Sequence, residues 1–299
     1  MPKYARFALV ASFVGLWIDS FLSHAVQALL GFALIFTFGI LHGANDLQLI
    51  RHTGSSFRMH DRRRMWGYYV AFVVAAAALF YLVPGVALLL FIVASGYHFG
   101  EQHIGAHLGP TVGKGFRTVF FTLYGLLVLF LVFYFHNEEV QQIVFGITHA
   151  LVPLVVFGWG LALVGSGVAL MGIALGTRDA VFRSVWVREL FYLGVFAVLF
   201  KVSGLIWGFA LYFILWHSVP SLLDQLRFLY GRAGVGEWKQ YLRNALPYWG
   251  IALAGLLISY LLLQDELVFE PLFFSFLAAI TFPHVWVILR MSGGRNGTE

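Results

Sequence analysis

Long apolar runs separated by short polar connections make up most of this 299-residue sequence. An α-helix rises about 1.5 Å per residue, so roughly 20 mostly apolar residues cross the hydrocarbon core of a bilayer. The segment 142–175 is long for one span, and we count it as one helix with an irregular lead around Pro153, although two spans are an alternative. The pattern predicts an all-α, polytopic transmembrane helical bundle that forms one domain over residues 1–299. The predicted spans are 5–22, 26–50, 66–83, 85–107, 116–135, 142–175, 187–202, 204–224, 245–263 and 271–290.

The composition agrees with a membrane protein and excludes several other classes. Hydrophobic residues make up 60% of the chain and charged residues 11%, with a mean hydropathy of +0.83, whereas an ordinary soluble domain has about 25% charged residues. A water-soluble globule, a disordered chain and a nucleic-acid-binding module are therefore excluded. The chain has no cysteine, which excludes disulfides, thiolate metal ligands, iron–sulfur clusters and cysteine nucleophiles.

The basic residues are distributed unevenly along the chain. Of the 19 Lys and Arg residues, 18 fall at the termini or on one set of alternate connections, and only Lys201 falls on the other set. Cytoplasmic loops of membrane proteins carry an excess of Lys and Arg, so we expect about ten spans with both termini cytoplasmic, in the cell (inner) membrane. The net charge of +5 is then a topology signal, strengthened by attraction to anionic lipid headgroups, and indicates no nucleic-acid partner.

Four of the eleven histidines lie inside predicted spans, where an ionisable side chain is costly and indicates function. They are His42, His98, His217 and His284. A single histidine in a span is more often a hydrogen-bond donor between helices than a ligand. The predicted orientation, however, puts all four at a similar depth in the cytoplasmic half of the membrane. Four imidazoles from four helices at one depth are what a metal centre in a helical bundle requires.

Carboxylates follow three of these histidines at helical spacing. They are Asp46, Glu101 and Asp224. A ligating imidazole usually donates its second N–H to a carboxylate or a carbonyl, so we expect these groups to orient the ligands, directly or across helices. Glycines beside two of the histidines would let neighbouring helices approach closely; they are Gly39, Gly43, Gly96 and Gly100.

His103 and His107 form an i, i+4 pair that looks like a pair of metal ligands. On a straight helix they lie about 140° and 180° round from His98, so the three rings cannot bind one ion. We expect both at the cytoplasmic interface, with His103 as a reserve ligand if the helix breaks early.

The ligand types narrow the chemistry of the predicted centre. Imidazole suits iron, copper, zinc and nickel. The sequence lacks the His-Glu-x-x-His pair of hydrolytic zinc sites and the serine-hydrolase signature. A redox metal among aromatic residues fits a lipophilic substrate that enters sideways from the bilayer.

Four short motifs resemble those of the Brp/Blh family, the membrane-embedded β-carotene 15,15′-dioxygenases of bacteria and archaea. The resemblance spans nearly the whole chain. It implies a non-haem Fe(2+) enzyme that uses O2 to split the central double bond of β-carotene, or of a related carotenoid, into retinal, which often supplies a microbial rhodopsin. The motifs are His42-Gly43-Ala44-Asn45-Asp46, Tyr97-His98-Phe99-Gly100-Glu101, Trp216-His217-Ser218 and Phe282-Pro283-His284.

The sequence departs from this family pattern at one position. The pattern has a second histidine four residues after the one that matches His217, and here that position is Ser221, a poor ligand. We take His284 as the substitute, so His42, His98 and His217 are the predicted catalytic residues and His284 completes the set of metal ligands.

Two other functions remain open from the sequence. One is another histidine-metal, lipid-modifying membrane enzyme, such as a desaturase or hydroxylase, although its usual clustered histidine boxes are missing. The other is a non-enzymatic carotenoid- or retinal-binding or transport protein, which is favoured if Ser221 marks a lost metal centre.

Overall fold

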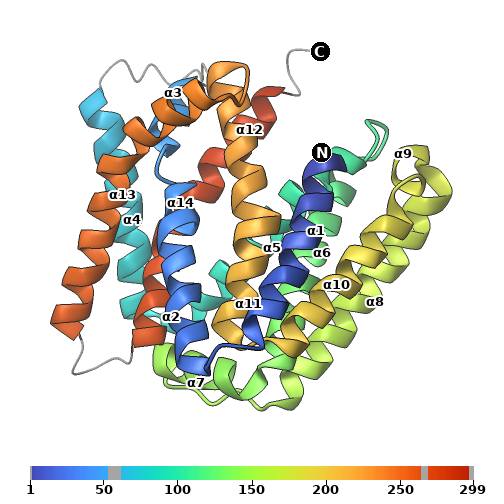
Figure 1. The fold of residues 1–299 in the computed structure, drawn as a ribbon, viewed down its shortest axis with the longest axis horizontal. Coiled ribbons are helices and arrows are strands. Elements are labelled where there is room, and N and C mark those ends of the chain that lie inside the picture. The colour runs from blue at the N-terminus through green and yellow to red at the C-terminus, as the bar shows by residue number, and fades with distance from the viewer. Residues whose placement is uncertain (1, 53–61, 264–268, 296–299) are drawn as a thin grey trace. The chain divides into compact units, whose positions relative to one another are not determined.

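The structure is a computed structural model that describes residues 2–52, 62–263 and 269–295. All regular secondary structure in these ranges is helical (Figure 1), which confirms the predicted fold class. Residues 53–61 and 264–268, which fall in connections between predicted spans, lie outside the described residues. The elements are α1 (Pro2–Asp19), α2 (His24–Leu34), η1 (Ile35–Gly39), α3 (Asp46–His52), α4 (Arg62–Leu82), α5 (Pro84–Ile104), η2 (Gly105–His107), α6 (Lys114–Phe135), α7 (Asn137–Thr148), α8 (Val155–Arg178), α9 (Ala180–Arg183), α10 (Trp186–Val202), α11 (Leu205–Tyr212), η3 (Phe213–Ser218), α12 (Val219–Tyr230), α13 (Val235–Leu263) and α14 (Phe269–Arg295).

Seven helices within the described ranges are long and apolar enough to cross a membrane. Each coincides with one of the ten spans predicted from the sequence. The other three predicted spans correspond to α1, to the broken run α2–η1–α3, and to α10, which are not among the seven. The seven are Arg64–Leu82, Pro84–His107, Lys114–Phe135, Val155–Arg178, Leu205–Tyr230, Val235–Leu263 and Phe269–Met291.

Two predicted spans are not continuous α-helices. In 142–175, α7 ends at Thr148 and α8 begins at Val155, and only α8 is a candidate span; the irregular lead predicted around Pro153 lies between them. In 26–50 the helix widens into the π-helix η1 and then breaks into turns before α3. Gly39 and Gly43 disfavour a continuing helix, and Asp46 suits the N-terminal turn of a new helix, where its charge interacts favourably with the helix dipole.

The described chain divides into two compact units. Unit 1 comprises Met1–Ile35, Ile92–Gln142 and Leu151–Ser218, and unit 2 comprises Phe36–Phe91, Ile143–Ala150 and Val219–Glu299. Each unit is assembled from three separate stretches of sequence, so its core is built from contacts between residues distant in the chain.

In unit 1, α6 packs against both α8 and α10, as Figure 1 shows. Glycines allow α5 and α6 to approach closely. A Cβ atom on Gly100 would lie 1.9 Å from the carbonyl oxygen of Phe121, and one on Gly125 would lie 1.9 Å from the carbonyl oxygen of Gly96. These distances are far below van der Waals contact, so Gly96 and Gly100 have the role predicted for them beside His98.

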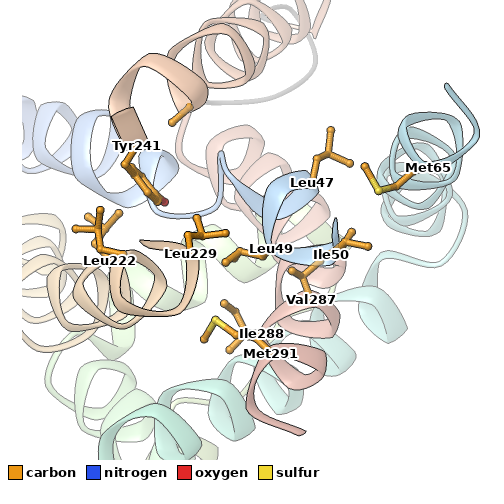
Figure 2. Close-up of a cluster of buried hydrophobic side chains, with 12 residues drawn as sticks. Leu47, Leu49, Ile50, Met65, Leu222, Leu229, Tyr241, Val287, Ile288 and Met291 are labelled. Atoms are coloured by element: carbon orange, nitrogen blue, oxygen red, sulfur yellow. The ribbon is translucent and has the colours of Figure 1, made fainter. Parts of the chain in front are cut away.

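In unit 2, a cluster of buried apolar side chains joins α3 to four long helices (Figure 2). Leu49 of α3 is fully buried in this cluster, as are Leu222 of α12 and Val287 of α14. Burial of this size stabilises each aliphatic side chain by roughly 1.5–3 kcal/mol. The cluster therefore anchors the short helix α3, which begins at Asp46, beside α12 and α14.

Candidate metal centre

Two of the predicted ligands lie together in unit 1. His98 is on α5 and His217 is on the π-helix η3, and the two side chains are almost completely buried. Their ring centroids are 4.7 Å apart with the planes nearly perpendicular, and a ring nitrogen of each lies within 4.8 Å of the other. Two imidazoles in this geometry can bind one ion between them.

Aromatic rings hold His217 in place. Phe213 stacks on the imidazole with a centroid distance of 5.4 Å and an angle of 14° between planes, and Phe99 lies 4.5 Å away. A π-helix turn is rare and is frequent at functional sites. Here the wider turn of η3 carries His217, and the neighbouring rings restrict its rotamer.

The other two predicted ligands lie together in unit 2. His42 follows the π-helix η1, and His284 is on α14 one residue after Pro283. Their ring centroids are 4.7 Å apart and the planes are 88° apart. The Nδ1 atom of His42 is hydrogen-bonded to the carbonyl of Gly39. Because a carbonyl only accepts, Nδ1 carries the proton, and Nε2 is the nitrogen with a lone pair for a metal.

Asp46 orients His284, although it lies much closer in sequence to His42. The Nδ1 atom of His284 is 2.8 Å from Oδ1 of Asp46, and Tyr69 donates to Oδ2 of the same carboxylate at 2.9 Å. The His284 and Asp46 side chains are 6% and 2% exposed. The Asp46 contact again assigns the proton to Nδ1 of the ring, as in the carboxylate–histidine pairs common around protein metal ions.

Ser221, which stands at the position of the expected family histidine, belongs to a buried polar network in unit 2. Its hydroxyl accepts from Nε2 of Gln225 at 3.2 Å, and the same amide donates to the carbonyl of His42 at 2.9 Å. The Tyr241 hydroxyl donates to Oε1 of Gln225 at 2.7 Å and lies 3.3 Å from the His42 carbonyl. The network therefore holds the backbone of the turn that carries His42.

The other two predicted carboxylates lie in different surroundings. Asp224 is half-buried on α12 and accepts from Arg227 at 3.3 Å. Glu101 is half-buried on α5, one turn after His98.

His103 is half-buried beside a carboxylate that the sequence analysis did not single out. Nε2 of His103 is 3.1 Å from Oε2 of Glu189, whose side chain is 4% exposed. Nδ1 of His107 is 3.6 Å from Oε1, and Arg188 lies 3.0 Å from the same oxygen. Helical spacing could not reveal this contact, because Glu189, on α10, is 86 residues from His103 in sequence.

The donor set fits a metal ion. His42, His98 and His217 are buried histidines that each can offer one ring nitrogen to a metal. The neutral imidazole is the ligating form of histidine. Nitrogen ligands without sulfur suit iron, copper or zinc.

A family model described as beta-carotene 15,15′-dioxygenase matches residues 33–292. The chain belongs to this family. The predicted resemblance is therefore confirmed, and the chain is a β-carotene 15,15′-dioxygenase-family enzyme, for which β-carotene and O2 are the implied substrates. Both histidine pairs, Asp46 and the Ser221 network lie inside the matched range. Searches of curated proteins and of solved structures found no match.

Sequence reasoning missed the residues that hold the dioxygenase-family histidines in place. Tyr69, Gln225 and Tyr241 contact Asp46 or the His42 carbonyl from three other helices. Gln225 gave no clear signal, because it lies just after the predicted span 204–224, beside Asp224, where a polar side chain is ordinary. The two tyrosines had none, since they resemble the many interfacial aromatic residues of this chain.

Proposed function

We propose that one iron(II) ion is held by His42, His98, His217 and His284, and that the enzyme uses O2 to cleave the central double bond of β-carotene into two molecules of retinal. One observation carries the proposal: the four histidines form two buried pairs with the same 4.7 Å ring separation, on a chain of the β-carotene 15,15′-dioxygenase family. Asp46 and the Gly39 carbonyl each fix the proton on Nδ1 of one ring, which directs Nε2 toward the ion.

The protein residues supply orientation and an apolar environment. When bound, iron(II) would supply the activation of O2 that a carbon–carbon double bond requires. Neutral imidazoles would leave the positive charge of such an ion uncompensated. Phe99 and Phe213 present apolar faces beside His217. These rings exclude water and suit a hydrocarbon polyene. Asp46, Glu101 and Asp224 orient ligands in this proposal, and Ser221 is not a ligand.

The proposal extends to the membrane arrangement. The chain forms one transmembrane domain of ten spans in the cell (inner) membrane, with both termini cytoplasmic. The support is the charge asymmetry of the connections together with the seven apolar helices. Retinal released into the bilayer would supply a microbial rhodopsin.

Expression in cells that produce β-carotene, with quantification of extracted retinal, tests the reaction. We expect the wild-type chain to form retinal and the His98→Ala variant to form none above background. His52→Ala is the matched control, because His52 is exposed on α3 and should retain activity. Undiminished retinal formation by His98→Ala would contradict the proposal.

Metal analysis of the purified protein separates this function from the two alternatives. We expect one iron per chain in the wild type and none in His98→Ala. Two irons per chain would favour a desaturase- or hydroxylase-like centre, and no transition metal would favour a carotenoid- or retinal-binding protein.

A further inference from the structure

Tyr241 of α13 contacts both ends of the turn 42–45, which lies between η1 and α3. Its hydroxyl lies 3.3 Å from the carbonyl oxygen of His42, and its own backbone carbonyl accepts from Nδ2 of Asn45 at 3.1 Å. Tyr241 and Asn45 are both fully buried, although they are 196 residues apart in sequence. One residue of α13 therefore contacts a proposed metal ligand and the residue directly before Asp46.

The turn needs contacts of this kind because it interrupts a helix. In a continuous α-helix the N–H of Asp46 would donate to the carbonyl of His42. Here it donates to the carbonyl of Gly43 at 3.3 Å. A buried carbonyl is costly unless it accepts a hydrogen bond, and Nε2 of Gln225 on α12 donates to the His42 carbonyl at 2.9 Å. A side chain from another helix thus takes the place of the helical N–H.

The Tyr241 hydroxyl determines how the Gln225 amide is oriented. A phenol has one proton to donate, and the oxygen nearest to it is Oε1 of Gln225 at 2.7 Å. Because Oε1 accepts from the phenol, the Nε2 end of the same amide faces the carbonyl of His42. Tyr241 therefore acts on the His42 backbone chiefly through Gln225.

The turn also lies directly against the second histidine of unit 2. A Cβ atom on Gly43 would lie 3.5 Å from Nδ1 of His284, which is an ordinary packing distance. The same Nδ1 atom contacts Oδ1 of Asp46 at 2.8 Å. A displaced turn would therefore move His42 and Asp46 together and change the positions of both imidazoles.

We infer that Tyr241 is a positioning residue of the proposed metal centre. Through Gln225 and Asn45 it fixes the turn 42–45 at both ends. It thereby determines where the His42 imidazole and the Asp46 carboxylate lie, although it touches neither metal nor substrate. The role in a metal centre rests on the proposed function.

Cobalt(II) binding to the purified full-length protein tests the inference. Imidazole sites bind cobalt, and the visible absorption of cobalt(II) changes with the arrangement of its ligands. We expect Tyr241→Phe to bind cobalt(II) about tenfold more weakly than the wild type and to shift the absorption bands. Wild-type affinity together with a wild-type spectrum in this variant would overturn the inference.

Tyr248→Phe is the matched control. Tyr248 is half-buried on the same helix and packs against the same apolar cluster as Tyr241. We expect its loss of a hydroxyl to leave the cobalt affinity and spectrum unchanged. Equal spectral shifts in both variants would show that Tyr241 has no particular role.

A double variant tests whether Tyr241 acts through Gln225. Gln225→Met removes the amide with little change in side-chain size and should also weaken cobalt binding. Because both residues act on one carbonyl, Tyr241→Phe combined with Gln225→Met should bind within about twofold of the weaker single variant. Effects that multiply would contradict the shared contact.

Steady-state kinetics give a second readout. Tyr241→Phe should lower kcat for retinal formation and leave KM for β-carotene unchanged, because Tyr241 acts on the turn and not on the substrate. A raised KM with unchanged kcat would overturn the inference.

His42→Ala separates failure of this inference from failure of the proposed function. We expect it to lose cobalt binding. If it does so while Tyr241→Phe behaves as the wild type, only the inference is overturned. Wild-type cobalt binding by His42→Ala would overturn the proposed metal centre itself.

Discussion

At the scale of single residues, the proton positions on the imidazoles are decided by their neighbours. Asp46 accepts from His284, and the Gly39 carbonyl accepts from His42. Each contact fixes the tautomer and the ring plane, and so orients the nitrogen that is proposed to bind the metal. Such neighbours of metal ligands typically contribute 10–100-fold in metal affinity or activity.

Replacing Asp46 tests this orientation. Asp46→Asn removes the charge that His284 faces and should lower iron affinity and retinal formation by about 10–100-fold. Tyr69→Phe removes only one hydrogen bond to the same carboxylate and should have a smaller effect in the same direction. Iron titration of the purified variants and extracted retinal are the measurements. Wild-type iron affinity in Asp46→Asn would show that His284 is not a ligand.

Ser221 and His284 can be compared directly as candidates for the fourth ligand. Ser221→Ala should keep iron within about twofold of the wild type and lose only about 1 kcal/mol of stability, because it removes one neutral hydrogen bond to Gln225. His284→Ala should lose iron. If Ser221→Ala loses iron and His284→Ala keeps it, the assignment of the two residues is reversed.

At the scale of elements, two π-helices precede or carry histidines that are proposed as metal ligands. The π-helix η1 ends three residues before His42, and η3 contains His217. A π-turn shifts the register of the following side chains relative to an α-helix. The close approach of α5 and α6 at Gly100 and Gly125 similarly determines where His98 lies.

Gly100→Ala tests the dependence of the site on this approach. The added Cβ would collide with the Phe121 carbonyl, so α5 and α6 must separate. We expect a loss of about 1–3 kcal/mol in stability, together with reduced retinal formation from a displaced His98. Gly85→Ala on the same helix is the control, because its Cβ would meet nothing within 4 Å. Thermal unfolding midpoints in detergent compare the two, and equal midpoints would refute the packing argument.

At the scale of the whole molecule, the charge asymmetry predicts which connections face the cytoplasm. The natural chain has no cysteine, so single introduced cysteines report topology without background. Val235 lies between the predicted spans 204–224 and 245–263, in a connection with several Lys and Arg residues. Glu138 lies between 116–135 and 142–175, in a connection with none. Both residues are exposed.

We expect Glu138→Cys to react with a membrane-impermeant thiol reagent when the cell membrane is intact and the reagent can reach its outer face. Val235→Cys should react only after the membrane is permeabilised. Mass shift of the labelled protein is the readout. Labelling of both residues from the same side would mean an even number of spans between them instead of the predicted three, and would reject the ten-span arrangement.

Much of the fold and part of the candidate metal centre could be predicted from the sequence. The helical class, seven of the predicted spans and the family motifs were all recognisable, because hydropathy and short motifs are local properties of the chain. The break within the predicted span 26–50 was not foreseen, since periodicity does not reveal a π-helix or the turns after Gly39.

The sequence by itself determined that this is a helical membrane protein with buried histidines of a carotene-cleaving family. Only the tertiary structure decided which carboxylates contact these histidines. Asp46 lies four residues after His42 but contacts His284, 238 residues away, and Glu189 pairs with His103 across 86 residues. Helical spacing specifies which side chains share a face of one helix, whereas partners on different helices depend on how all the helices of a unit pack.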